Sequence, residues 1–379
     1  MTSKTIKGIK IDINRINATT NWILNSGIQS SSGGFFSWHN LGSREYSYLY
    51  SEITGYGITT LLFLYSVSGD NVYIKRAVEA ADWIIKTSMH PCGGVRTRLY
   101  KDDSKANREY SFSGARIFSF DTGMVLYGMV NIYKATGKKK YLDASTKLAE
   151  FLLEKVQRED GSLAPIYDAN IDEQIEPSDK WSSQSGAFHA KISMGLADLF
   201  DVTQKDIYKK AAIKICNNAI SAQERSGRFI TDRILKTTHV HPHSYAAEGL
   251  WYTGNSLKIA DFTKSAKKAA EWSFKCVLTS GINELYNPVS DSFSNFQRSD
   301  ILAQTLRLGA ICSIADSKIG LLRDLLLSYQ FINNRSKQRG GFFYCRENRD
   351  INSWCSMFSL QALMLDQDRG LISNGFLLV

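Results

Sequence analysis

Apolar residues recur at helical spacing along most of the chain, in segments that share one pattern. Four segments begin with an aromatic residue, place a small residue four positions later and continue with small or aliphatic residues; they span residues 73–83, 141–151, 208–218 and 262–272. Small residues one and two turns apart on one face let two helices approach closely. The segments start 68, 67 and 54 residues apart, a spacing that fits two helices plus loops. Each segment therefore predicts one helix of a repeated hairpin.

Partner helices stand between these segments. Gly69 and Gly137 end two of them and are followed by short turns, so each partner is predicted to pair antiparallel with the helix that follows it. The predicted partners span residues 54–68, 122–136, 187–203, 245–252, 300–314 and 354–365. Loops in which a glycine precedes an apolar residue separate the hairpins; they begin at Gly33, Gly93, Gly161, Gly227 and Gly340, and residues 283–286 are expected in the sixth place.

Counting from residues 11–25 onward gives about twelve helices, or six hairpins. Six hairpins whose inner helices run in the same direction close naturally into a ring. We therefore predict an all-α fold, a single (α/α)6 toroid that occupies residues 1–379 as one domain. The length of 379 residues alone would suggest two or three domains, but the repeat outweighs that estimate.

Composition narrows the class of protein. Aromatic residues make up 12% of the chain, which suits a large core, a sugar-binding cleft or both. The net charge of +9 favours anionic partners, among them acidic glycans. No apolar run approaches the length of a membrane span, and residues 1–10 lack the apolar stretch of a secretory signal. Because the six cysteines are scattered without a CxxC pair, we expect reduced thiols and a cytoplasmic protein.

Three local motifs resemble known carbohydrate-active proteins. Phe120-Asp121-Thr122-Gly123-Met124, followed by Tyr133-Lys-Ala-Thr-Gly137 and Lys140-Tyr141-Leu142-Asp143, resembles the segment of unsaturated glucuronyl hydrolases that carries a catalytic Asp at the mouth of an inner helix. The whole layout resembles the six-hairpin toroid superfamily, which also includes N-acylglucosamine 2-epimerase-like proteins. The segments from Gly33 to Trp38 and from Ser51 to Tyr56 resemble uncharacterised proteins of exopolysaccharide-biosynthesis clusters. The resemblance implies a catalytic role for Asp121 alone.

Polar residues gather where the predicted inner helices begin. Aligning these helices by their apolar pattern places Thr54, Thr122, His189 and His243 at equivalent positions in the first turn. Glu52, Asp121 and His241 stand beside them, and the fifth and sixth inner helices add Arg298, Asp300 and Trp354. Because the long loops lie at the same end, these side chains are predicted to converge at one mouth of the ring.

Such a set suits acid–base chemistry on a glycan. Asp121 is our candidate for the proton donor, with Glu52 or Asp300 as its carboxylate partner. Arg298 is expected to hold a uronate carboxylate. The candidates for stacking against sugar rings are Trp38, Tyr56, Tyr245, Trp251 and Trp354. The leading hypothesis is therefore metal-independent cleavage of an acidic, uronate-type saccharide, within polysaccharide biosynthesis.

Other interpretations remain open at this point. His189 and His243 form the alternative of a two-base sugar epimerase, and a non-catalytic glycan-binding or assembly protein is a third hypothesis. Asp121 or Asp300 can also be a simple helix cap, and a histidine in a first turn is often structural. The run His239-Val-His241-Pro-His243 has no carboxylate or cysteine at a ligand spacing, so no metal is predicted. Nucleotide-binding motifs are absent and the lysine clusters lie at turns, so neither a cofactor nor nucleic acid is expected.

Overall fold

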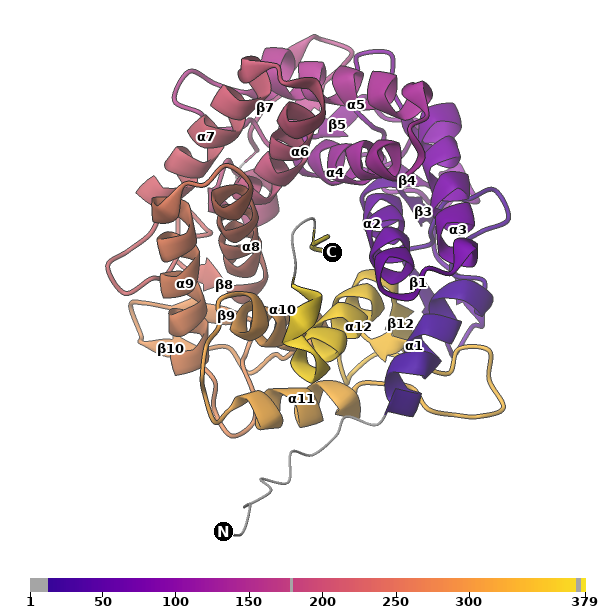
Figure 1. The fold of residues 1–379 in the computed structure, drawn as a ribbon, viewed down its shortest axis with the longest axis vertical. Helices are drawn as coiled ribbons and strands as arrows, with labels where there is room; N and C mark the ends of the chain where they lie inside the picture. Colours follow the sequence, from indigo (N-terminus) through magenta and orange to yellow (C-terminus); the bar gives the residue numbers. More distant parts are fainter. Residues whose placement is uncertain (1–12, 178–179, 373–375) are drawn as a thin grey trace.

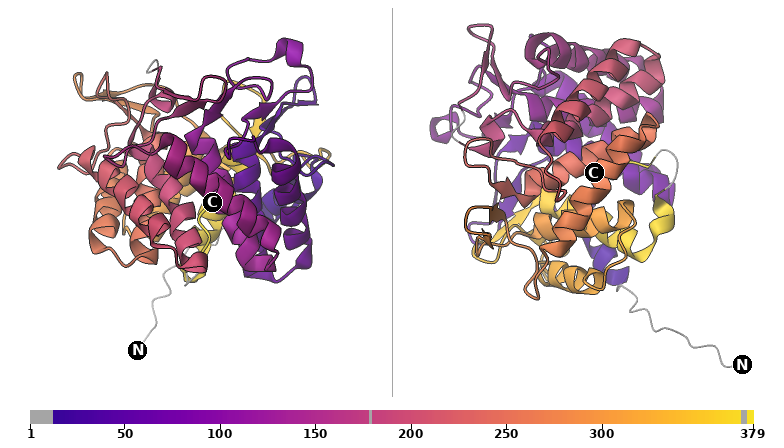
Figure 2. Two further views of the ribbon diagram at one scale, coloured as in Figure 1. Left: turned by 90° about the horizontal axis from the view of Figure 1, so that it is seen from above. Right: turned by 90° about the vertical axis from the view of Figure 1, so that its left-hand side faces the viewer.

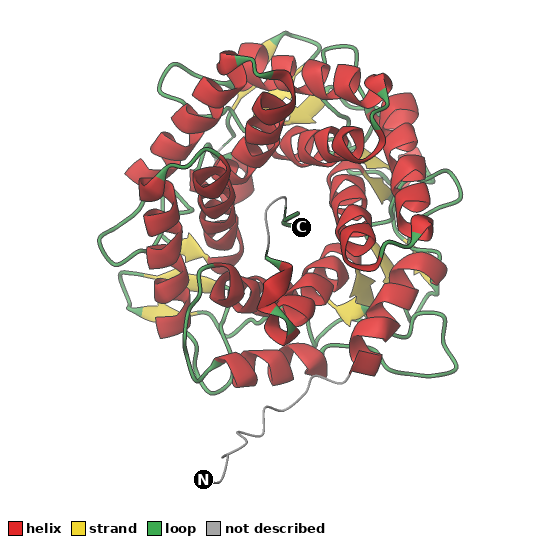
Figure 3. Ribbon diagram, viewed as in Figure 1, coloured by secondary structure: helices red, strands yellow, loops and turns green. Residues whose placement is uncertain are grey.

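Two concentric rings of helices make up the protein. A computed structural model describes residues 13–177, 180–372 and 376–379, and within these residues the chain forms twelve α-helices (Figures 1 and 3). The inner helices are α2 (Ser51–Ser68), α4 (Ser119–Thr136), α6 (Ser193–Thr203), α8 (Val240–Ser256), α10 (Ser299–Ile311) and α12 (Ser353–Gln367). The outer helices are α1 (Ile13–Asn25), α3 (Asn71–Trp83), α5 (Lys139–Phe151), α7 (Asp206–Ser221), α9 (Ala260–Lys275) and α11 (Ile319–Ser328). The predicted (α/α)6 toroid is confirmed.

The ring closes where the last hairpin meets the first. Helix α12 packs against α2 and α1, and strand β1 (Trp38–Asn40) pairs antiparallel with β12 (Asp350–Asn352). Residues 11 and 12, included in the first predicted helix, and residues 1–10, where no secretory signal is expected, lie outside the described residues. None of the described helices is both long and apolar enough to cross a membrane.

The burial of each helix follows from its place in the rings. Inner helix α2 is buried along most of its length, because the ring interior covers one side and the outer helices cover the other. Outer helix α9 instead buries one stripe, which contains Phe262, Ala266 and Ala270, and exposes charged residues on the other face. The small residues that recur in the outer helices therefore mark their contact with the inner ring.

Glycines let the loops approach the neighbouring outer helices. Gly33 has φ +106°, and a Cβ atom there would lie 2.2 Å from the carbonyl oxygen of Glu79 on α3. A Cβ on Gly340, at the equivalent place, would lie 2.0 Å from the carbonyl oxygen of Ala18 on α1. In the loop after α9, the corresponding β-bridge joins Leu278 to Gly281. This loop is shorter than the others, so the predicted residues 283–286 fall just after the bridge.

Short antiparallel strands gather at one end of the ring, where the inner helices begin (Figure 2). The remaining strands are β2 (Glu45–Tyr46), β3 (Leu49–Tyr50), β4 (Arg98–Leu99), β5 (Arg116–Phe118), β6 (Ile166–Asp168), β7 (Glu173–Ile175), β8 (Thr238–His239), β9 (Leu285–Asn287), β10 (Ser292–Phe293) and β11 (Phe342–Phe343). Leu49 of β3 stands opposite Leu99 of β4. This pairing brings the start of α2 next to the loop that precedes α4, and the two positions frame the site described below.

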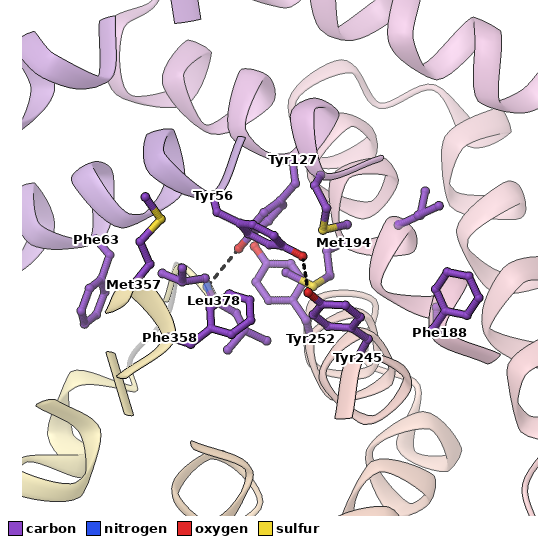
Figure 4. Packing of buried hydrophobic residues seen from close by; sticks show 14 of the residues in the cluster. Tyr56, Phe63, Tyr127, Phe188, Met194, Tyr245, Tyr252, Met357, Phe358 and Leu378 are labelled. Atoms are coloured by element: carbon purple, nitrogen blue, oxygen red, sulfur yellow. Dashed lines mark hydrogen bonds between the residues drawn. The ribbon is translucent and has the colours of Figure 1, made fainter. Parts of the chain in front are cut away.

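The last described residues fill the ring interior. Leu378 and Val379 are fully buried, and the backbone N–H of Leu378 donates to the Tyr127 hydroxyl at 3.1 Å (Figure 4). Tyr127 lies two turns into α4, whereas the strand end of the ring begins at its first turn. Residues 376–379 therefore occupy the interior of the ring below the mouth.

Candidate active site

A cavity of about 320 Å³ opens at the strand end of the ring. It is rich in aromatic rings and also contains two carboxyl groups, a guanidinium, an ammonium and an imidazole. The lining residues are Tyr48, Tyr50, Glu52, Ile53, Arg98, Tyr110, Phe118, Phe120, Asp121, Lys180, Trp181, Ser182, Phe188, His241, Tyr245 and Trp354. Residues from most of the repeats therefore meet in one place, as the alignment of the inner helices predicts.

The second residue of an inner helix repeatedly faces this mouth. Glu52, Phe120, His241 and Trp354 are the second residues of α2, α4, α8 and α12, and all four line the cavity. The inner helices are related by the internal repeat, so the same helical position points toward the ring axis in each of them. Asp121, the third residue of α4, joins this set next to Glu52 on the neighbouring helix α2.

Glu52 and Asp121 form the electrostatic centre of the cavity. Burial raises the pKa of Asp121 well above its ordinary value, and the negative charge of Glu52 raises it further, while Arg98 opposes both effects. Burial also raises the pKa of Glu52, opposed by hydrogen bonds with Tyr50 and Tyr56. The two carboxyl groups thus share an environment that disfavours the ionisation of both at once.

Asp121 does not act as a helix cap. The N-cap residue of α4 is Phe118, which has no capping side chain, and the buried Oδ2 of Asp121 has no hydrogen-bond partner among the described residues. Its side chain is only 4% exposed. A buried carboxyl oxygen without a partner is costly unless the group is protonated or a ligand reaches it. The placement favours a chemical role over the capping interpretation.

Arg98 lies in a cage of tyrosines on the cavity wall. Its guanidinium carbon stands 4.7, 5.3 and 4.2 Å from the ring centres of Tyr48, Tyr50 and Tyr110. The Lys180 ammonium lies 4.9 Å from the Tyr110 ring. Cation–π contacts hold the guanidinium in place without neutralising its charge. The cavity lining therefore carries two positive groups beside the two carboxyl groups.

Asp300 and Arg298 lie behind the wall and do not line the cavity. The Arg298 Nε donates to Asp300 Oδ1 at 3.1 Å, and the Trp354 indole donates to Asp300 Oδ2 at 3.2 Å. Asp300 is fully buried, yet Arg298 and His241 hold its pKa below the ordinary value against the effect of burial. Arg298 is thus occupied by Asp300 and by Glu284, at 2.6 Å, and the structure does not place it as a carboxylate clamp on substrate.

The predicted stacking residues lie at different distances from the cavity. Tyr245 and Trp354 line the cavity, whereas Tyr56 lies beneath it with its hydroxyl bonded to that of Tyr245 at 3.0 Å (Figure 4). Trp38 does not line the cavity but packs edge-on against Tyr48, which does, with ring centres 5.1 Å apart. Trp251 packs against Phe376, away from the mouth, so its predicted contact with sugar is not supported.

The structure does not bring His189 and His243 together at the cavity. His243 is fully buried between the inner and outer rings of helices. Its Nδ1 accepts the Phe229 backbone N–H at 3.2 Å, and its Nε2 contacts the Ala269 carbonyl at 3.1 Å. The Nδ1 of His189 accepts the backbone N–H of Gly186 at 3.4 Å, and burial lowers the pKa of His189 to about 3. Neither imidazole lines the cavity, which disagrees with the predicted two-base pair.

Sequence reasoning missed the residues that come from strands and loops. Arg98 lies on β4, Tyr110 in the loop before β5 and Trp181 in the short helix η4 (Trp181–Ser183). One signal was available, since Tyr46, Tyr48 and Tyr50 alternate with other residues ahead of α2 and indicate an extended segment with one aromatic face. For Arg98 and Lys180 the sequence holds no comparable pattern. Among the described residues, no three His, Cys, Asp or Glu side chains are grouped to hold a metal ion.

Comparisons with known proteins identify the family and agree with the fold. A model of glycosyl hydrolase family 76 matches residues 14–277. A sugar epimerase from a ruminal bacterium superposes with a TM-score of 0.76 at 11% identity, covering 95% of this chain and 99% of that one. An unsaturated glucuronyl hydrolase from a Bacillus species superposes with a TM-score of 0.63 at 14% identity, covering 94% and 97% of the two chains. At these identities, the structural likeness shows a shared fold.

One curated protein also matches part of the chain. The uncharacterised protein B0495.5 of Caenorhabditis elegans is 29% identical over 114 residues, which cover 29% of this chain. The match spans 15% of the length of that protein.

Proposed function

Because this chain belongs to glycosyl hydrolase family 76 and is a carbohydrate-active, glycoside-hydrolase-like enzyme, we propose that its pocket cleaves a glycosidic bond in an acidic, uronate-type saccharide. The observation that carries this proposal is the pairing of Glu52 and Asp121. Both carboxyl groups lie in the cavity, and the pKa of each is raised above its ordinary value. A glycosidase needs one carboxyl that keeps its proton near neutral pH and a second group that supports the reacting carbon.

Asp121 is the proposed proton donor. It gives its proton to the glycosidic oxygen as the bond between that oxygen and the anomeric carbon breaks. Glu52, as the carboxylate, supports the positive charge that develops at the anomeric carbon and takes a proton from the water that attacks it. Proton transfer from Glu52 to Asp121 then restores the starting state, and the net reaction consumes one water. No metal enters the proposed steps.

The acidic nature of the proposed substrate is supported by Arg98 and Lys180. Both line the same cavity as the carboxyl pair, and the tyrosine cage fixes the Arg98 guanidinium while keeping its positive charge in the cavity. A guanidinium can bind a uronate carboxylate through two parallel hydrogen bonds. The aromatic residues around it, among them Trp181 and Tyr245, supply flat surfaces for the sugar ring.

Cleavage is favoured over the predicted two-histidine epimerisation by the number of imidazoles at the site. A two-base epimerase needs a second base positioned to return the proton that the first one removes. Of the described residues that line the cavity, His241 is the single histidine, and His189 and His243 lie elsewhere. The likeness to sugar epimerases at 11% identity concerns the fold.

Proton NMR in D2O tests the proposal. The protein is incubated with oligosaccharides and methyl glycosides of glucuronic acid and with their neutral glucose and mannose counterparts. We expect new reducing-end signals from uronate-containing compounds, and a decrease in rate of about 100- to 10,000-fold for Asp121→Asn. Asp143→Asn, on the exposed face of α5, is the matched control and should keep the full rate.

Other spectra would contradict cleavage. Loss of a ring-proton signal without new reducing ends would indicate epimerisation. Line broadening without any change in the sugar would indicate a glycan-binding protein. An Asp121→Asn variant with wild-type turnover would remove Asp121 from its assigned role.

A further inference from the structure

His241 is a cavity residue for which the proposed cleavage has no role. It is the second residue of α8, on the side of the ring opposite α2 and its Glu52 (Figure 1). The residue is only 7% exposed, and it lines the cavity. The ring lies between aromatic neighbours, with its centre 4.3 Å from the ring of Tyr245 and 6.2 Å from that of Trp181.

One nitrogen of this imidazole is held from behind. His241 Nδ1 lies 3.2 Å from Asp300 Oδ2 and 2.7 Å from the side-chain oxygen of Gln304, both on α10. Asp300 is fully buried and accepts from Arg298, from the Trp354 indole and from the backbone N–H of Ile301, so it remains an anion and can only accept. Nδ1 therefore carries the proton, and the tautomer of His241 is determined by its neighbours.

The other nitrogen is then left as an acceptor. Within the described residues no hydrogen bond reaches His241 Nε2, and it is not among the buried atoms that lack a partner. Burial lowers the pKa of His241 to about 4, together with the positive charges of Arg298 and Lys191, and it outweighs the opposing effects of Asp300 and of the hydrogen bond with Gln304. The ring is neutral at ordinary pH, so its Nε2 offers a lone pair to the cavity.

We propose that His241 Nε2 accepts a hydrogen bond from a hydroxyl group of the bound sugar and thereby selects its orientation, with Asp300 as the positioning residue that fixes the acceptor. This inference rests on the proposed function for the identity of the ligand. The tautomer and the charge of the imidazole do not depend on that function. A buried acceptor that finds no donor is penalised, so sugars lacking a hydroxyl at this point bind less well. The His241 contact thus adds specificity on the wall opposite the carboxyl pair.

The state of the imidazole is measured first, without any sugar. In protein labelled with ¹⁵N-histidine, long-range ¹H–¹⁵N spectra distinguish a protonated from an unprotonated ring nitrogen, and loss of one set of signals in His241→Gln assigns the residue. We expect a neutral ring with the proton on Nδ1 in the wild type. Asp300→Asn should reduce the excess of that tautomer, although the Gln304 oxygen still lies 2.7 Å from Nδ1. A proton on Nε2 in the wild type would overturn the proposal, and an unchanged tautomer ratio in folded Asp300→Asn would remove Asp300 from its positioning role.

The contact with sugar is measured with two variants that differ in acceptor capacity. Gln places an amide oxygen near the position of Nε2, whereas Leu fills the space without an acceptor. For the compound that the wild type cleaves fastest, we expect kcat/KM to fall by about 10-fold or more in His241→Leu and by no more than about 3-fold in His241→Gln. His90→Leu, on an outer loop, is the control and should match the wild type.

The outcomes separate this inference from the proposed cleavage. If His241→Leu and His241→Gln lose activity equally, the ring has only a packing role and the inference is wrong. If none of the compounds is cleaved, the same two variants are compared by their dissociation constants for the methyl glycosides. A difference between Leu and Gln there supports the His241 contact even though cleavage has failed, and equal constants contradict it.

Discussion

His243 makes in the fourth hairpin the contact that Thr54 makes in the first. The Thr54 hydroxyl accepts the backbone N–H of Phe35 at 3.0 Å, and His243 Nδ1 accepts that of Phe229 at 3.2 Å. Thr122 accepts the N–H of Val95 at 3.3 Å in the same way. In each case the residue tethers a glycine-containing loop to the inner helix. His243 therefore occupies a structural position that holds a threonine hydroxyl in the first two hairpins. This role explains why it does not line the cavity.

His243→Ala is accordingly expected to affect stability and not chemistry. The substitution leaves the buried N–H of Phe229 without an acceptor, which should lower the free energy of unfolding by about 1–3 kcal/mol. Turnover measured well below the unfolding temperature should stay close to that of the wild type. Denaturant titration and the NMR assay check the two parts. A stable variant without turnover would return His243 to a catalytic role.

Glu52→Gln should lower the pKa of Asp121. The negative charge of Glu52 disfavours ionisation of the neighbouring carboxyl, so its removal eases the loss of the Asp121 proton. A ¹³C-carboxyl titration of labelled aspartate should show the change, and the alkaline limit of any residual activity should move to lower pH. A pKa of Asp121 that is the same in the variant and the wild type would mean that the two groups are not coupled.

Arg98→Met should discriminate between acidic and neutral sugars. The variant keeps much of the side-chain volume within the tyrosine cage but loses the charge, and a hydrogen bond to a charged group contributes about 1.5–3 kcal/mol. The KM for a uronate-containing compound should rise about 10- to 100-fold, while a neutral analogue is unaffected. Arg108→Met, on the exposed loop after β4, serves as the control. Equal losses for both sugars would remove the uronate from the proposal.

Glu248→Gln should destabilise the protein strongly. Fully buried Glu248 pairs with Lys191 at 2.7 Å and with Arg307 Nε at 3.0 Å, so its removal leaves two cations without their anion. Loss of one partner in a buried ion pair costs about 3–5 kcal/mol. Glu79→Gln, in an exposed pair with Arg76 on α3, should change stability by less than about 1 kcal/mol.

The effect of Glu248 should also depend on pH. Arg307 and Lys191 hold the pKa of Glu248 below its ordinary value, despite burial. The stabilisation is therefore complete above the pKa of an unfolded glutamate and is lost as the pH falls through the lowered pKa. The difference between wild type and Glu248→Gln in urea titrations should shrink toward low pH. A difference that is constant across that range would contradict this account.

Helix boundaries illustrate how far the periodicity reaches. The outer helices begin within two residues of the predicted starts where the aromatic pattern marks them, as in α3 and α5. The inner helices begin three residues before Thr54 and Thr122, at Ser51 and Ser119. Their first turns hold polar residues that face the cavity, so the apolar stripe used for prediction starts one turn too late. The polar residues that delay the start of the apolar stripe, Glu52 and Asp121, are the ones that line the candidate site.

The candidate site was predictable in part for the same reason. Glu52, Asp121, Tyr245 and Trp354 lie on helices whose repeat places them at one end, and all four line the cavity. Asp300 also lies at that end, but Arg298 neutralises it behind the wall. A one-dimensional pattern assigns a residue to a turn of a helix. The pattern does not tell whether that carboxylate pairs with a buried cation from the same turn or remains available to a ligand.

The repeat in the sequence by itself determined the six hairpins, their order and the end of the ring at which the polar residues meet, because helix packing depends on spacing that can be read along the chain. Tertiary structure alone decided which of those polar residues face the cavity. It brought Arg98 and Lys180 to the wall from a strand and a loop without periodicity, and it placed His243 between the rings. It also paired His241 with Asp300 across two helices. Such contacts join residues far apart in sequence, so their chemistry arises only when the ring closes.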